Sequence, residues 1–208
     1  MPLPDDLAFG RPRNAAAPKP GVVTADGVLD AAGCRRLIRF AEDRGFAEAT
    51  VRDDAANPAG GVMMKRIRDN DRVTVDDDAC AARLWAALRP LAARFDQPDR
   101  AAGLNGRLRF YRYGPTQRFK RHRDQEERVG GRVSRVTVLL YLSDGFGGGE
   151  TLFHERTYAG GVGTDHKVAV RPRAGSVLLF RHPLWHEGVA VTAGRKYVLR
   201  TDVMYAAG

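Results

Sequence analysis

From residue 106 onward, the chain consists of short β-prone runs separated by glycine-rich turns. Several runs alternate apolar with polar side chains, which is the period of a strand with one buried face. Many short strands at this spacing are typical of a sandwich or barrel, and eight strands in two sheets form a jelly roll. The predicted strands are 107–113, 118–122, 135–143, 149–155, 167–172, 176–181, 184–191 and 196–205.

The first half of the chain predicts helices that support this β core. Asp30 can cap a helix whose apolar residues follow helical spacing, and Gly45 is a suitable stop. A second helix is predicted at 79–95, where Pro90 is expected to kink or split it. The predicted fold class is therefore α+β: a double-stranded β-helix (jelly roll) core at about 106–205 with N-terminal supporting helices.

The length of 208 residues suits one domain, which we place at 21–208. The preceding residues, 1–20, contain five prolines and predict a flexible arm. No apolar run approaches the roughly 20 residues that a membrane span needs, so no membrane association is expected. Two cysteines cannot make a disulfide framework, and a reducing cytoplasm is the expected location.

The formal net charge of +9 favours anionic partners, such as nucleic acid, acidic protein segments or small carboxylates. A dispersed basic surface that serves solubility alone explains the same number. The cations at 118–121 illustrate both alternatives, because they can attract an acidic substrate or form a solvated strand edge.

A histidine and an aspartate stand two residues apart in the predicted strand region HRD, as His122 and Asp124. Residues i and i+2 of an extended strand point to the same side, so both side chains can aim at one point. A second histidine, His186, opens a predicted strand that a jelly roll can bring alongside. Two histidines and one carboxylate on one face of a metal form the ligand set of non-haem Fe(II) oxygenases. The alternative for His186 is a core histidine packed beside Trp185.

A third candidate feature lies on the predicted strand 196–205. Strand parity puts Lys196 and Arg200 on one face and Arg195 on the other. A lysine inside a β barrel costs several kcal/mol unless it is paired, and a bound carboxylate would explain it. The alternative is that Lys196 ends a strand in solvent.

Taken together, these motifs resemble those of a known enzyme family. HRD, His186 and GRKY at 194–197 resemble the iron and co-substrate motifs of the prolyl 4-hydroxylase branch of the 2-oxoglutarate/Fe(II) oxygenases. FYRYGPTQRFKRH, TVLLYLSDGFGGGETLF, LDAAGCRRLIRFAEDRGF and RDNDRVTVDD resemble the flanking strands and helical support of that family. The resemblance covers about 21–205.

The resemblance implies roles for individual side chains. His122, Asp124 and His186 would bind Fe(II), while Lys196 would pair with the distal carboxylate of 2-oxoglutarate. Some family members carry this basic residue one place earlier, so the adjacent Arg195 could serve instead. Asp202 departs from the pattern, because some prolyl hydroxylases have a bulky aromatic residue there. The resemblance further implies co-substrate contacts by Tyr141, Tyr113 and Thr151, with Arg200, Arg195, Asn70 and Arg72 as candidates for substrate or co-substrate contact.

The activity implied is hydroxylation of an unactivated C–H bond with O2 and 2-oxoglutarate, releasing succinate and CO2, with ascorbate in a supporting role. A peptide or protein substrate, with a prolyl residue first, is the leading expectation. The same chemistry on a nucleic acid base or a small metabolite is the alternative, and a non-catalytic jelly-roll metal-binding protein is an alternative of another class. Candidate lid loops are 57–61, 125–131 and 154–166.

Overall fold

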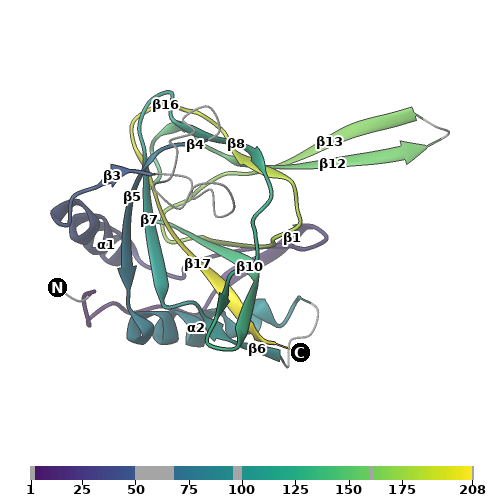
Figure 1. The fold of residues 1–208 in the computed structure, drawn as a ribbon. Coiled ribbons are helices and arrows are strands. Elements are labelled where there is room, and N and C mark those ends of the chain that lie inside the picture. The colour runs from purple at the N-terminus through teal and green to yellow at the C-terminus, as the bar shows by residue number, and fades with distance from the viewer. Residues whose placement is uncertain (1–2, 50–67, 96–99, 160–161, 208) are drawn as a thin grey trace, which may run out of the picture.

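The computed structural model describes residues 3–49, 68–95, 100–159 and 162–207, and is shown in Figure 1. Two antiparallel sheets dominate it. The larger sheet has the strand order β1-β2-β14-β10-β17-β7-β5-β3, and β6 and β9 join its strands β17 and β10. Its strands are β1 Arg13–Lys19, β2 Val22–Asp26, β3 Ala47–Glu48, β5 Asp71–Asp76, β6 Ala101–Leu104, β7 Arg107–Tyr113, β9 Arg128–Val129, β10 Arg132–Tyr141, β14 Val177–Arg181 and β17 Lys196–Ala206.

The second sheet has five strands in the order β13-β12-β15-β8-β4, and β11 and β16 form a separate pair. A core that includes Tyr141, Phe153, Phe180 and Val198 joins side chains of the two large sheets. This mostly antiparallel arrangement, with two helices, confirms the predicted jelly-roll class. The strands are β4 Arg68–Asp69, β8 Arg118–His122, β11 Gly147–Gly148, β12 Thr151–Ala159, β13 Val162–Val170, β15 His186–Gly188 and β16 Val191–Ala193.

The helices α1 (Ala31–Asp43) and α2 (Asp78–Ala92) pack their apolar faces against the larger sheet. Asp30 caps α1 as predicted, because its Oδ1 accepts a hydrogen bond from the backbone N–H of Gly33 at 2.6 Å. The expected split of α2 at Pro90 is wrong, since the helix runs on to Ala92. A proline so close to the helix end removes only one hydrogen bond from the last turn.

The predicted flexible arm at 1–20 is also wrong for the residues that the structure describes. Leu3 and Leu7 are 1% and 4% exposed and belong to the main hydrophobic core. Arg13–Lys19 forms the edge strand β1. Proline suits such an edge, because an edge strand leaves some N–H groups unpaired. The proline content suggested a flexible arm, but the two buried leucines hold this segment against the core.

Of the three candidate lid loops, the stretch 154–166 is not a loop over its described part. The strands β12 and β13 pair from Thr151 opposite Val170 to Ala159 opposite Val162. Together they form a long ribbon that projects from the body in Figure 1. The second candidate, 125–131, contains β9 and the turn that leads into β10. The third, 57–61, lies outside the described residues.

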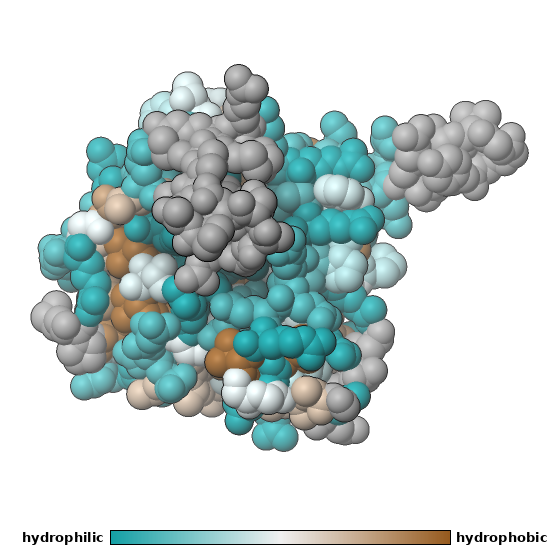
Figure 2. Space-filling view, in the orientation of Figure 1, coloured by the Kyte–Doolittle hydropathy of each residue, from teal (hydrophilic) through white to brown (hydrophobic). Residues whose placement is uncertain are grey.

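The surface in Figure 2 is mostly hydrophilic, and within the described residues the large hydrophobic side chains that are exposed are Val129 and Trp185. Cys34 and Cys80 are buried free thiols. Burial raises the pKa of both to about 11, so neither is a ready nucleophile. Neither helix has the length and apolar character that crossing a membrane would require, as far as the described residues go.

Candidate metal and co-substrate site

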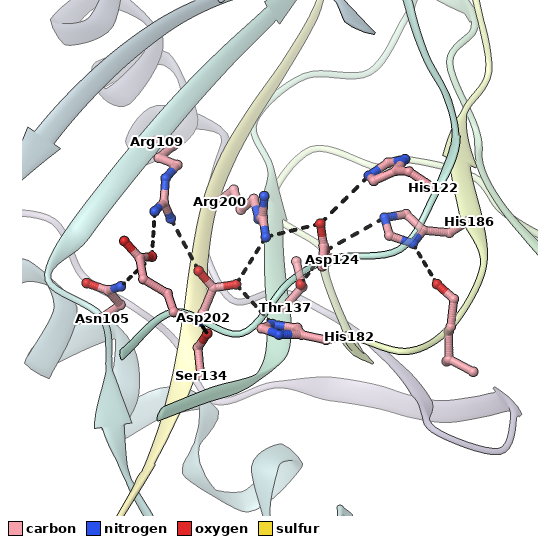
Figure 3. Close-up of polar contacts among 12 residues, drawn as sticks. Asn105, Arg109, His122, Asp124, Ser134, Thr137, His182, His186, Arg200 and Asp202 are labelled. Atoms are coloured by element: carbon pink, nitrogen blue, oxygen red, sulfur yellow. Dashed lines mark hydrogen bonds and ion pairs between the residues drawn. The ribbon is translucent and has the colours of Figure 1, made fainter. Parts of the chain in front are cut away.

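The two histidines predicted as metal ligands lie on neighbouring strands. His122 ends β8 and pairs directly with His186, which begins β15. Their ring centroids are 4.2 Å apart, and Asp124 follows β8 by two residues. One donor atom from each of the three lies within 4.8 Å of the others, and Figure 3 shows both imidazoles facing the carboxylate. The convergence expected from the sequence is therefore present.

The backbone sets the orientation of both imidazoles. The Nδ1 atom of His122 lies 2.7 Å from the carbonyl oxygen of Lys120, and that of His186 lies 2.9 Å from the carbonyl oxygen of Leu184. A carbonyl oxygen only accepts, so each Nδ1 carries the proton and each Nε2 presents a lone pair. These Nε2 atoms lie 3.7 and 3.8 Å from the Asp124 carboxylate. The donor set therefore fits a divalent transition metal such as Fe(II).

Burial and nearby charges keep His186 and Asp124 in their metal-binding protonation states. Burial lowers the pKa of His186 to about 4, so its ring is neutral near pH 7. Burial alone would raise the pKa of Asp124, but the Arg200 guanidinium and the imidazoles hold it well below its usual range. Asp124 is also fixed in place, since Thr137 Oγ1 donates to its Oδ2 at 2.5 Å and Arg200 Nη2 lies 3.2 Å from its Oδ1.

Lys196 lies buried in the same cavity, with 5% of its surface exposed. Its ammonium donates to the carbonyl oxygen of Gly149 at 2.6 Å and lies 5.4 and 5.7 Å from the ring centres of Tyr113 and Tyr141. Burial lowers its pKa to about 8. The alternative of a solvent-exposed strand end is therefore wrong for Lys196. Arg195 is the residue that is exposed.

The cavity that joins these groups is lined mainly by aromatic and apolar side chains. Thr151 lines this cavity, and its hydroxyl oxygen lies 2.7 Å from that of Tyr141, a hydrogen-bond distance. The Tyr141 ring centre lies 5.7 Å from Lys196 Nζ, although Tyr141 itself does not line the cavity. Such a cavity suits a small ligand with one anionic end. The lining residues are Tyr111, Tyr113, Phe119, His122, Asp124, Thr137, Leu139, Thr151, Phe180, His186, Gly188, Lys196, Val198 and Arg200.

The remaining predicted contacts divide into two groups. Arg200 reaches the cavity and the metal group, as described above. Asn70 and Arg72 do not line this cavity. Asn70 is 3% exposed, and its Oδ1 accepts a hydrogen bond from Arg68 Nε at 2.7 Å. Asn70 therefore holds a neighbouring side chain instead of forming a cleft rim.

Two residues near the site, Arg68 and Thr137, were not predicted from the sequence. Arg68 is 8% exposed, and its guanidinium lies over the rings of Tyr111 and Phe119 at 4.5 and 4.8 Å. Thr137 stood in an ordinary β-prone run. Parity of the β10 strand relative to the predicted Tyr141 could have found Thr137, because the two lie four residues apart and share a face.

Behind the metal group, Asp202 is the centre of a buried polar network, drawn in Figure 3. Its carboxylate lies 3.3 Å from His182 Nε2, 3.2 Å from Arg109 Nη1 and 3.4 Å from Arg200 Nη2. Arg109 Nη2 extends the network to Glu127 Oε2 at 2.6 Å. Asp202 is 2% exposed, and its carboxyl pKa lies below the usual range in spite of burial, because of Arg200 and His182.

The fold and the site resemble those of the 2-oxoglutarate/Fe(II) oxygenases, and the comparisons with known proteins point to the same class. Residues 108–201 match the model of the 2OG-Fe(II) oxygenase superfamily. That stretch contains the three metal-group residues and Lys196. The resemblance inferred from the sequence is thereby confirmed.

Several of the similar proteins are described as prolyl hydroxylases. A Pseudomonas putida prolyl-4-hydroxylase structure matches with a TM-score of 0.60 and 22% identity, covering 90% of this chain and 94% of that one. A Trichoplax adhaerens prolyl hydroxylase, solved with a hypoxia inducible factor peptide fragment, matches with a TM-score of 0.60 and 19% identity, covering 89% and 84%. "Probable prolyl 4-hydroxylase 11" of Arabidopsis thaliana is 41% identical over 73 residues, which are 35% of this chain and 24% of that protein. The match thus spans about a quarter of the curated relative.

Proposed function

We propose that the chain is a 2-oxoglutarate- and O2-dependent Fe(II) dioxygenase that hydroxylates an unactivated C–H bond of a peptidyl residue, with proline as the first candidate. One observation carries this proposal: the His122–Asp124–His186 group and the buried ammonium of Lys196 share one cavity. A metal-binding protein without catalysis has no need of the lysine. A dioxygenase that takes a dicarboxylate needs both.

The side chains would divide the work between metal and co-substrate. The two Nε2 atoms and the Asp124 carboxylate would hold Fe(II) on one face and leave other positions open. Bound iron and 2-oxoglutarate supply the oxidising chemistry, with succinate and CO2 as products. Lys196 would pair with the distal carboxylate of 2-oxoglutarate, beside the hydroxyls of Tyr141 and Thr151.

A peptide or protein substrate is supported by the relatives, one of which is described in complex with a peptide. The choice of proline rests on the same relatives. Asp202 bears on that choice, because some prolyl hydroxylases have a bulky aromatic residue at this position, and here the position holds a buried carboxylate within an ion-paired network. The prolyl substrate therefore needs its own test, with proline-containing peptides compared directly with other substrates.

A nucleic acid is the second candidate substrate, and one surface feature favours it. Trp185, next to His186, is 38% exposed, and the guanidinium groups of Arg121 and Arg123 lie 5.1 and 4.5 Å from its ring centre. Exposed aromatic rings among cations can stack bases and pair with phosphates. The net charge of +9 points in the same direction.

The test is succinate formation by the purified chain with Fe(II), ascorbate and 2-oxoglutarate. Proline-rich peptides should stimulate turnover, whereas stimulation by oligonucleotides alone would favour the second candidate. A His122→Ala variant should lose turnover and keep its fold by circular dichroism. Bound metal without succinate under any condition would identify a non-catalytic metal-binding protein.

We also propose a cytoplasmic location, because Cys34 and Cys80 are free thiols buried in the core. A fluorescent fusion of the full chain tests this directly. Fluorescence that spreads evenly through the cytoplasm is expected, and export from the cell would overturn the proposal.

A further inference from the structure

Arg200 lies between two buried carboxylates, one of which belongs to the metal group. Its Nη2 atom is 3.2 Å from Asp124 Oδ1 and 3.4 Å from Asp202 Oδ1. Figure 3 shows the guanidinium bridging the two acids. The side chains of Asp124 and Asp202 are 6% and 3% exposed, so solvent screens these interactions little.

This arrangement has opposing effects on a metal ion. Before a metal binds, Arg200 neutralises Asp124 and, together with Thr137, fixes its orientation. Once a dication sits on the same carboxylate, the guanidinium repels it across a short distance in a partly dry site. A cation so close to a metal ligand is tolerable only if a further negative charge offsets it.

Asp202 has the position and the support to supply that charge. It contacts the same Arg200 Nη2 atom that pairs with Asp124, and His182 and Arg109 hold it in place at 3.3 and 3.2 Å. In the described contacts, the side chains of His182 and Arg109 do not touch the three metal-group side chains. Asp202 can thus act on the metal through Arg200.

We propose that Asp202 is a positioning residue that offsets the charge of Arg200, and that the Arg200–Asp202 pair thereby sets the affinity of the site for its metal. This inference rests on the metal site of the proposed function and adds a determinant of its affinity. Removing Asp202 leaves Asp124 as the one carboxylate paired with Arg200 among the described contacts, and weakens metal binding. Removing Arg200 relieves the repulsion and strengthens it.

The test is a double-mutant cycle on the affinity of the metal-free full chain for Mn(II), measured from the electron paramagnetic resonance signal of free Mn(II). The Asp202→Asn variant should raise the dissociation constant by at least about tenfold, because it removes a negative charge close to the bound dication. The Arg200→Gln variant should lower it by a similar factor. The double variant should return to within about threefold of the unmodified protein.

Arg112 provides a matched control. It also lies between two carboxylates, at 2.8 Å from Asp71 Oδ2 and 2.8 Å from Glu42 Oε2, but it lines no part of the metal cavity. The Asp71→Asn variant should leave the Mn(II) dissociation constant unchanged. Thermal unfolding of each metal-free variant shows whether it is folded before the titration.

Each result has a defined meaning. Opposite shifts in the two single variants, cancelled in the double variant, support the proposal. An unchanged dissociation constant in folded Asp202→Asn, or weaker binding in Arg200→Gln, overturns it. If the Asp202→Asn variant fails to fold, the Arg200→Gln variant alone decides, because its predicted shift is a gain of affinity that misfolding cannot mimic. Failure of the unmodified protein to bind Mn(II) would instead contradict the proposed function.

Discussion

Lys196 and Tyr113 face each other across the paired strands β17 and β7, and the Lys196 ammonium lies 5.4 Å from the centre of the Tyr113 ring. The partner to which this ammonium donates is the neutral carbonyl of Gly149. Within the described residues, no ion pair is formed by it, and its pKa is lowered by burial. A buried cation held by aromatic rings and one carbonyl is a site prepared for an anion.

Replacing Lys196 by methionine should therefore remove co-substrate binding without harming the fold. We expect the KM for 2-oxoglutarate to rise about a hundredfold, the usual worth of a charged hydrogen bond. Steady-state succinate formation measures this change, and the melting temperature should not fall. The exposed neighbour provides the control, since Arg195→Met should leave the KM unchanged. If Arg195→Met raised the KM as much as Lys196→Met does, the assignment of the distal carboxylate to Lys196 would be contradicted.

The same lysine predicts a pH dependence. Its pKa in the free protein is about 8, and only the protonated form attracts a carboxylate. The KM for 2-oxoglutarate should therefore be flat below pH 8 and rise up to about tenfold per unit above it. A Lys196→Arg variant should lack this rise, because a guanidinium stays charged. A KM that falls on going from pH 8 to pH 9 would refute the assignment.

Thr137 predicts an effect on the metal ligand it holds. Its hydroxyl donates to Asp124 Oδ2 at 2.5 Å, so Thr137→Val should free one carboxylate oxygen and raise the Mn(II) dissociation constant about tenfold. Thr137→Ser keeps the hydroxyl and should retain most of the affinity. Equal affinities of the valine and serine variants would show that the hydrogen bond does not position Asp124.

The anchored N-terminal segment predicts a stability effect far from the site. Leu7 is 4% exposed in the main core, so Leu7→Ala should lower the free energy of unfolding by about 2–5 kcal/mol. Ala17 is exposed on β1, and Ala17→Ser should change the free energy of unfolding by less than about 0.5 kcal/mol. Denaturant unfolding distinguishes the two. Equal stability of both variants would mean that this segment is not part of the core in solution.

Local patterns in the sequence predicted the parts of the fold that depend on local chemistry. The strands at 107–113 and 118–122 have the predicted bounds, and the cap at Asp30 is present. His122 and Asp124 share one side of an extended segment, which is a property of backbone geometry. The predicted strand at 184–191 is instead shortened to β15, and β16 begins only at its last residue, Val191.

The features that the sequence did not reveal depend on contacts between distant residues. Leu3 and Leu7 reach a core built from later strands and both helices. Asp202 joins Arg109, whose strand lies about ninety residues earlier in the chain. Pairing of this kind follows from strand order, and composition or periodicity carries no signal for it.

A crystal structure of the chain with Mn(II) and 2-oxoglutarate tests the central claim most directly. We predict one metal ion at about 2.0–2.3 Å from the Nε2 atoms of His122 and His186 and from the Asp124 carboxylate, with the far carboxylate of 2-oxoglutarate on Lys196 Nζ. A metal bound elsewhere, or a co-substrate whose far carboxylate contacts Arg195 in place of Lys196, would contradict the account.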